Sequence, residues 1–318
     1  MATHLQLILE NPTKLFWSIW QSLVYLFLVF IQRILLPNAC RAVTLRTEIA
    51  RAILGSFLAN FWDLLFKASP SLRDDEYLLL NAGQVPAVLV PPDRDVGRIG
   101  SKKDGKRKLL LLYSHGGGYF FGEPLMYIST YKRWIRAAAR ENVELTIVSV
   151  DYRLSKTHKY PACLEDMMKW YETLLDQYKV LPEQIVFGGD SAGGGLAAMT
   201  VLNIKKLRGP SPGGMLLVSP WLDLEMKDTL HHPAMSTDFL ITFTKDNPVL
   251  VDALLPLGMK PDDPRVSPVF DDLSNLPPQL VIAGGAEVLL ADSEKWVQKS
   301  KAAGNKVDYI VGQGQMHT

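Results

Sequence analysis

The chain has 318 residues, of which 47% are hydrophobic and 21% charged, and its formal net charge is +1. This length suits one large globular domain with an appendage, and the balanced charge gives no indication of a nucleic-acid partner. The two cysteines, Cys40 and Cys163, show no C-x-x-C or Cys/His spacing, so the sequence predicts neither a disulfide framework nor a metal site.

The first predicted element is a long apolar segment near the N-terminus, residues 15–36. Its sequence is LFWSIWQSLVYLFLVFIQRILL, and about 20 apolar residues are enough for a helix to cross a bilayer. Trp17, Trp20 and Tyr25 are residue types that favour the membrane interface. We therefore expect residues 1–44 to form an N-terminal membrane anchor.

Two alternatives to an anchor stay open for this segment. A cleaved signal peptide would have a shorter apolar core and a small-residue cleavage site, for which residues 38–40 (Asn-Ala-Cys) are a weak match. A soluble cap helix is the second alternative. Only Lys14 lies just before the segment, whereas several arginines lie at its end and beyond, so the positive-inside rule predicts that the globular domain faces the cytosol.

A second apolar segment follows, within residues 45–74. Its charged residues, Arg46, Glu48, Arg51 and Asp63, predict an amphipathic helix and not a second membrane span. Such a helix would cover an active site, lie on the membrane surface or pack on the core.

From residue 75 onward, short apolar runs alternate with helical patterns. The apolar runs lie at 85–90, 109–113, 145–150, 185–187, 215–218, 280–283 and 307–311. Helical patterns lie between most of these runs, at about 126–140, 161–178, 192–207 and 291–303. This alternation predicts an α/β domain over residues 75–318, with a mostly parallel central sheet and helices on both faces.

The alternation breaks between residues 221 and 278, where prolines and paired acidic residues replace the regular patterns. A long irregular insertion after a central strand is a usual position for a lid over a pocket. We expect a lid insertion at about 221–278.

The strongest motif is Gly-Asp-Ser-Ala-Gly at residues 189–193, between an apolar run and a helical pattern. A serine on a sharp strand-to-helix turn has its hydroxyl exposed, and the flanking glycines allow the tight turn. This context predicts Ser191 as a nucleophile that a base must activate. The alternative, a glycine-rich turn of a nucleotide-binding protein, lacks the G-x-G-x-x-G order and the P-loop lysine.

A second motif, His115-Gly116-Gly117-Gly118, follows another apolar run. An ester carbonyl gains negative charge in its tetrahedral intermediate, and closely approaching backbone N–H groups stabilise that charge. The motif predicts an oxyanion hole formed by the N–H groups of Gly117 and Gly118, with that of Ala192 after the nucleophile. A flexible loop is the alternative.

Three motifs, at residues 115–119, 151–154 and 188–194, together resemble the hormone-sensitive-lipase group of α/β-hydrolases. The resemblance covers roughly residues 75–318, and the anchored layout is similar to the arylacetamide-deacetylase and fungal steryl-acetyl-hydrolase branches. It implies the α/β-hydrolase fold and an ester hydrolase without metal or organic cofactor. It also implies attachment to the endoplasmic-reticulum membrane with the domain in the lumen, the opposite side from the arginine pattern.

The resemblance also implies where the other two members of a catalytic triad lie. The family places an acid after the next-to-last strand and a histidine after the last, in the order Ser, acid, His. His317 occupies the histidine position, and Glu287 occupies the position of the usual aspartate, with Asp292 as the alternative acid. Because the family adds a helix after the histidine, we expect that C-terminal helix to be missing here and the His317 loop to fray.

These features predict a serine carboxylester hydrolase that acts on short-acyl esters, such as acetyl esters, of apolar alcohols. Its expected partners are a small apolar ester and the membrane at residues 15–36. The resemblance keeps two alternatives open, because one plant branch of the family is a receptor and a transferase or cyclase would use the same serine. Failure to label Ser191 with a fluorophosphonate favours the receptor, and product analysis separates a transferase.

Overall fold

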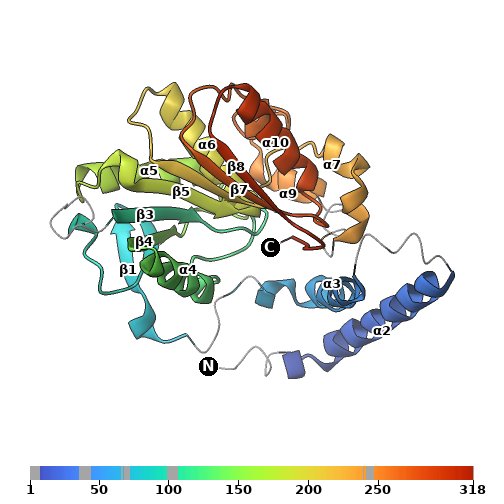
Figure 1. Cartoon of the computed structure of the whole chain (residues 1–318). Helices are drawn as coiled ribbons and strands as arrows, with labels where there is room; N and C mark the ends of the chain where they lie inside the picture. Colours follow the sequence, from blue (N-terminus) through green and yellow to red (C-terminus); the bar gives the residue numbers. More distant parts are fainter. Residues whose placement is uncertain are drawn as a thin grey trace.

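The computed structural model describes residues 8–35, 44–65, 67, 72–98, 107–238, 240 and 247–317. Its centre is an eight-stranded sheet in the order β1-β2-β4-β3-β5-β6-β7-β8 (Figure 1). The two antiparallel pairs are β1 with β2 and β2 with β4, and every other neighbouring pair is parallel. The predicted α/β-hydrolase fold with a mostly parallel sheet is therefore confirmed. The strands are β1 (Leu78–Ala82), β2 (Val85–Val90), β3 (Arg107–Ser114), β4 (Val143–Val150), β5 (Ile185–Asp190), β6 (Gly214–Val218), β7 (Gln279–Gly284) and β8 (Val307–Gly312).

Seven of these strands contain the predicted apolar runs, whereas β1 was not predicted. Its three leucines are followed by Asn81, and the strand lies at the edge of the sheet, where Leu79 is 64% exposed. A short edge strand buries little apolar surface, and its sequence pattern is correspondingly weak.

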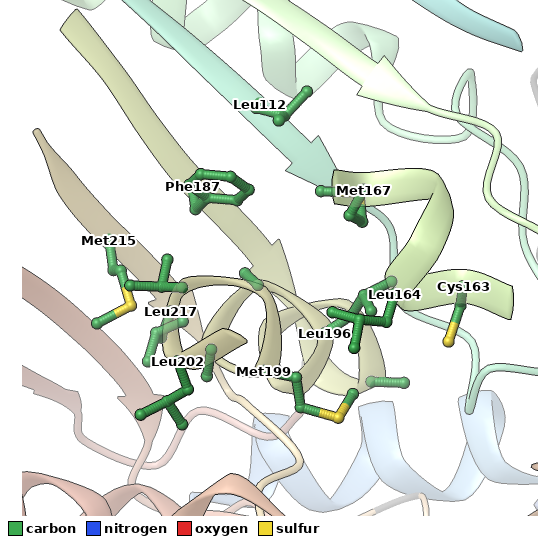
Figure 2. Close-up of a cluster of buried hydrophobic side chains, with 14 of the residues drawn as sticks. Leu112, Cys163, Leu164, Met167, Phe187, Leu196, Met199, Leu202, Met215 and Leu217 are labelled. Atoms are coloured by element: carbon green, nitrogen blue, oxygen red, sulfur yellow. The ribbon is translucent and has the colours of Figure 1, made fainter. Parts of the chain in front are cut away.

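Helices cover both faces of the sheet. The larger core packs α5 (Ala162–Asp176), α6 (Ser191–Lys206) and α10 (Leu290–Ala302) on one face, and α4 (Ile128–Arg140) packs on the other. Alternate residues of β3 enter the two cores, because successive strand side chains point to opposite faces. Leu112 joins the α5–α6 core shown in Figure 2, and Leu111 joins the α4 core.

The packing between sheet and helices fixes the position of α6, the helix that begins at the predicted nucleophile. In Figure 2 Phe187 of β5 and Leu217 of β6 lie over Leu196 and Leu202 of α6. All four side chains are at most 2% exposed. Burial of each such side chain stabilises the fold by about 1.5–3 kcal/mol, so the start of α6 is anchored by a rigid core.

The apolar N-terminal helix is present as α2 (Pro12–Leu35), and α3 (Leu45–Leu65) lies beside it (Figure 1). The two helices are joined by an ion pair between Arg33 Nε and Glu48 Oε2 (2.5 Å) and by a hydrogen bond from Asn60 Nδ2 to Gln21 Oε1 (3.0 Å). Residues 36–43, which include the alternative cleavage site, lie outside the described residues.

The segment between β6 and β7 is as irregular as predicted. It contains α7 (Lys227–His231), η4 (Pro233–Thr237), α9 (Asn247–Leu254) and η5 (Pro268–Phe270). Residues 239 and 241–246 of the expected lid lie outside the described residues, and the lid role stays a prediction. After β8, described residues 313–317 form a turn and no helix, with His317 only 8% exposed.

Candidate active site

Ser191 lies at a sharp turn between β5 and α6. Its φ is +50°, a left-handed conformation that is costly for a residue with a Cβ. The neighbouring backbone leaves no space for side chains on either side. An added Cβ would lie 2.3 Å from the Gly193 carbonyl carbon at Gly189, and 2.0 Å from Ser114 O at Gly193. The two motif glycines are therefore required by close backbone approach, as the nucleophile-elbow motif predicts.

The glycine loop after β3 turns tightly beside this elbow. Gly117 and Gly118 have φ values of +114° and +63°. An added Cβ on Gly117 would lie 2.3 Å from Phe121 O, and Phe121 N donates a hydrogen bond to Gly117 O (2.8 Å). The N–H of Ala192 belongs to the first turn of α6, where helical N–H groups have no intrahelical acceptor. The structure thus brings the three predicted oxyanion donors to the same end of the sheet.

Asp190, the residue before Ser191, joins the elbow to the glycine loop. Its buried carboxylate accepts hydrogen bonds from Tyr113 Oη (2.8 Å), Tyr127 Oη (2.7 Å) and Gly116 N (3.0 Å). Burial raises the pKa of Asp190, and the bonds from the two tyrosines act in the opposite direction. Sequence reasoning assigned no role to Asp190, although it lies inside the recognised motif.

His115 supports the glycine loop through ring stacking and hydrogen bonds. Its ring is fully buried and stacks on Tyr152 with a centroid distance of 4.4 Å, and the Tyr152 hydroxyl donates to His115 O (2.7 Å). Burial lowers the pKa of His115 to about 4, so the ring is neutral at physiological pH. In that state Nδ1–H donates to Gly116 O (2.8 Å). His115 therefore positions the loop and does not exchange protons near neutral pH.

The predicted acid and base come together at the carboxyl ends of β7 and β8. His317 Nδ1 lies 3.5 Å from Glu287 Oε2, and the same oxygen accepts a hydrogen bond from Ser219 Oγ. Burial lowers the pKa of His317, but Glu287, Asp238 and Asp190 together raise it more, so the pKa lies above its ordinary value.

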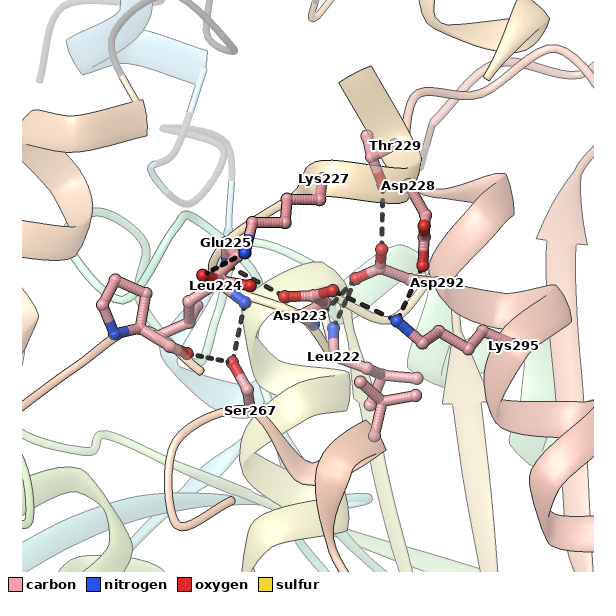
Figure 3. A network of polar contacts seen from close by, with 12 residues as sticks. Leu222, Asp223, Leu224, Glu225, Lys227, Asp228, Thr229, Ser267, Asp292 and Lys295 are labelled. Atoms are coloured by element: carbon pink, nitrogen blue, oxygen red, sulfur yellow. Dashed lines mark hydrogen bonds and ion pairs between the residues drawn. The ribbon is translucent and has the colours of Figure 1, made fainter. Parts of the chain in front are cut away.

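Asp292, the alternative acid, is engaged elsewhere. It lies in the first turn of α10 and accepts hydrogen bonds from Leu222 N (2.8 Å), Asp223 N (2.9 Å) and Thr229 Oγ1 (2.9 Å), as Figure 3 shows. Burial raises its pKa to about 7. This carboxyl ties the loop after β6 to α10, and its bonds are to that loop and not to His317.

The loop after β6 is also tied to the elbow, because Trp221 N donates to Ser191 O (2.8 Å). Ser219 and Asp238 belong to the long segment that follows β6, and sequence reasoning missed both. Neither lies in a recognisable motif. Ser219 bonds to Glu287, 68 residues away in the chain, and Asp238 bonds to the backbone of Val288 and His317, 50 and 79 residues away. Among the described residues, no three His, Cys, Asp or Glu side chains form a group able to hold a metal ion.

Comparison with known proteins gives consistent similarities. A family model described as alpha/beta hydrolase fold matches residues 111–318, a range that contains all three motifs. The chain is 33% identical over 236 residues to an esterase of Acinetobacter venetianus, covering 71% of this chain and 73% of that protein. It is 31% identical over 209 residues to an acetyl-hydrolase of Streptomyces hygroscopicus, covering 66% of each.

Solved structures show the same similarity in three dimensions. An esterase from the bacterial hormone-sensitive lipase family matches with a TM-score of 0.65 at 28% identity, over 86% of this chain and 83% of that chain. The matched part of this chain is longer than the α/β domain alone.

Proposed function

Because this chain belongs to the alpha/beta hydrolase fold family and is a serine carboxylester hydrolase of the hormone-sensitive-lipase group, we propose that it cleaves short-acyl esters of apolar alcohols with Ser191, His317 and Glu287. The observation that carries the proposal is the buried Glu287–His317 pair, which the loop after β6 connects to the Ser191 elbow through Ser219 and Trp221. A serine needs a base to become nucleophilic, and the base needs an orienting acid.

In the proposed reaction, His317 takes the hydroxyl proton of Ser191 as the serine oxygen attacks the ester carbonyl carbon. The N–H groups of Gly117, Gly118 and Ala192 stabilise the resulting oxyanion. His317 then gives its proton to the departing alcohol, and the acyl group stays on Ser191. Water, deprotonated by the same imidazole, attacks the acyl-enzyme and releases the acid. Throughout, Glu287 stabilises the imidazolium by its charge.

The space beside the glycine loop supports a short acyl group. Leu250 of α9 lies over Gly118. An added Cβ at Gly118 would be 3.0 Å from Leu250 Cδ1. A side chain this close to the oxyanion loop would limit the length of an acyl chain on that side. The acetyl-hydrolase among the relatives supports the same preference.

The contact between α3 and the histidine loop supports an apolar alcohol. Thr47 Oγ1 donates a hydrogen bond to Gly314 O (3.2 Å), so α3 lies against the loop that carries His317. Leu54, two turns further along the same face of α3 as Thr47, exposes apolar surface there (42%). An alcohol with a large apolar body would be accepted more readily at this surface than a polar one.

We further propose that α2 anchors the enzyme in a membrane. Its 24 residues are long and apolar enough to cross a membrane, by length and composition, and its polar Ser18 and Ser22 are buried. Large apolar side chains face outward instead, among them Phe16, Trp17, Trp20, Phe27 and Phe30. Polar residues inside and apolar residues outside are typical of helices that pack in lipid. The resemblance to anchored deacetylases favours the endoplasmic reticulum.

Hydrolysis of p-nitrophenyl acetate, butyrate, octanoate and palmitate by the full chain in detergent tests the proposal. We expect the highest kcat/KM for acetate or butyrate and no turnover by Ser191→Ala. Turnover that survives Ser191→Ala would contradict the proposed nucleophile, and absence of turnover by the native chain would favour a receptor. A transferase would give an acylated alcohol instead of free acid when a second alcohol is supplied.

A further inference from the structure

A third carboxylate lies beside the proposed acid and base. Asp238 is fully buried at the end of η4, in the segment between β6 and β7. Its Oδ2 accepts two backbone hydrogen bonds, from Val288 N (2.7 Å) and His317 N (3.1 Å). Its Oδ1 accepts a third from Leu240 N (3.2 Å).

The two N–H groups on Oδ2 belong to the two catalytic loops. Val288 follows Glu287 directly, and the other N–H is that of His317 itself. One oxygen atom therefore joins the backbone of the acid to the backbone of the base. A buried carboxylate with several N–H partners is a strong acceptor, because charge-assisted hydrogen bonds are roughly twice as strong as neutral ones.

The neighbouring residue reinforces this connection. Thr237 Oγ1 donates a hydrogen bond to Ala286 O (2.9 Å), so two successive residues bind both sides of Glu287. Two backbone hydrogen bonds also join the loops directly. Ala286 N donates to Gln315 O (2.8 Å), and Gly285 N donates to Gly312 O (2.8 Å). Both of those bonds lie before Glu287 and before His317, whereas the bonds to Asp238 join the two loops at the catalytic residues themselves.

The Asp238 carboxylate also lies near His317, from whose backbone N–H it accepts a hydrogen bond, and its charge acts on the imidazole. The carboxylates that act on His317 come from three elements: Glu287 after β7, Asp238 after η4 and Asp190 at the end of β5. Glu287 has the largest effect of the three. An imidazolium formed during ester cleavage would therefore be stabilised by Asp238 as well, without direct contact between the two side chains.

We propose that Asp238 is a positioning residue for the triad, which holds the Glu287 and His317 loops together through one oxygen and adds negative charge near the imidazole. The proposal rests on the proposed function, since it presupposes that Glu287 and His317 are the acid and base. It gives the segment between β6 and β7 a structural part in catalysis beyond covering the site.

Two substitutions separate the geometric effect from the charge effect. Asp238→Asn keeps one oxygen that can accept from Val288 and His317 but removes the charge. Asp238→Ala removes both. We expect Asp238→Ala to lower kcat for p-nitrophenyl acetate about 100-fold, because small misplacements of catalytic groups have effects of that size. Asp238→Asn should lower kcat less, with KM nearly unchanged in both variants.

The pH profile distinguishes positioning from a merely structural role. Removal of the Asp238 charge should move the acidic limb of kcat/KM to lower pH in Asp238→Asn, because the imidazolium loses a neighbouring negative charge. Asp223→Asn is the matched control, since Asp223 is another buried aspartate of the same segment but interacts with Lys295. It should leave the acidic limb unchanged.

A folded Asp238→Asn variant with the native kcat and the native acidic limb would overturn the proposal. If Asp238→Ala does not fold, titration of His317 by NMR in Ser191→Ala and in Ser191→Ala/Asp238→Asn measures the same charge effect directly. Equal titration midpoints would again contradict it. Failure of the proposed function would show separately, as activity that survives Ser191→Ala or Glu287→Gln.

Discussion

His317 Nδ1 lies 3.5 Å from Glu287 Oε2, and the two side chains are 3% and 0% exposed. The separation is long for a hydrogen bond, but such bonds shorten when substrate binds and the imidazole gains a proton. Each loop reaches this position from the carboxyl end of a parallel strand, β7 or β8, and the two strands are neighbours. Adjacent strand ends thus bring together two residues that are 30 positions apart in the chain.

Substitution of the two candidate acids should have very different effects on catalysis. Glu287→Gln removes the charge beside His317 and should lower kcat by about 10³–10⁴, in line with loss of the orienting acid in serine hydrolases. Asp292→Asn should lower kcat less than about tenfold, because Asp292 bonds to the loop after β6 and not to His317. Steady-state kinetics with p-nitrophenyl acetate measures both. A loss of kcat in Asp292→Asn that is larger than the loss in Glu287→Gln would assign the role of the acid to Asp292.

The activity should depend on pH through His317. The base must be neutral to accept the Ser191 proton, and its pKa in the folded protein is raised above the ordinary value of 6.5. Activity should therefore be full above that raised pKa and fall as pH drops through it. In Glu287→Gln the acidic limb should move to lower pH. An unchanged limb in that variant, measured as kcat/KM between pH 4.5 and 9, would argue that another group controls the rate.

His115 provides an internal check on that profile. With a pKa of about 4, it is neutral over most of the pH range of the assay, so an acidic limb near neutral pH does not come from His115.

Alanine at Gly189 should disrupt the elbow. Its Cβ would lie 2.3 Å from the backbone of Gly193, and backbone cannot move aside as a side chain can. We expect a lower melting temperature and more than about 100-fold loss of kcat, since nucleophile and oxyanion donors both shift. Gly209→Ala is the control, because its nearest neighbour is the movable Ile204 Cγ2 at 3.2 Å. Native activity in Gly189→Ala would show that the turn tolerates a side chain.

Charge on the outer surface of α2 should release the protein from membranes. Phe27 and Phe30 are 62% and 63% exposed, and each arginine at the centre of a membrane helix costs about 2.5–3.5 kcal/mol. The double substitution Phe27→Arg/Phe30→Arg should therefore move the protein into the soluble fraction after carbonate extraction. Leu207→Arg, at a similarly exposed leucine of the hydrolase domain (66%), should leave it in the pellet. Full retention of the double variant would speak against α2 as the anchor.

Local sequence patterns predicted much of the fold because each element carries its own signal. The alternating apolar runs predicted seven strands, and the glycines around Ser191 predicted the turn that the backbone contacts require. The family and the ester hydrolase activity expected from the three motifs are confirmed by the comparisons.

The features of the site that the sequence did not predict depend on contacts between residues far apart in the chain. Asp238 and Ser219 act on loops far along the chain, and no spacing rule connects them to Glu287 or His317. Asp190 lies inside the motif that the sequence shows, but its role depends on hydrogen bonds from Tyr113 and Tyr127, which lie 77 and 63 residues before it. Edge strand β1 was missed because its apolar run of three leucines is short and does not alternate, and the strand is defined by its pairing with β2.

The central claim is that Ser191 is a nucleophile activated by His317 in this chain. Covalent labelling with a fluorophosphonate, followed by mass spectrometry of the peptide that contains residues 185–206, tests it most directly. The account predicts an adduct on Ser191 in the native chain, none in Ser191→Ala, and greatly slowed labelling in His317→Ala. An adduct on another serine, or equal labelling rates with and without His317, would contradict it.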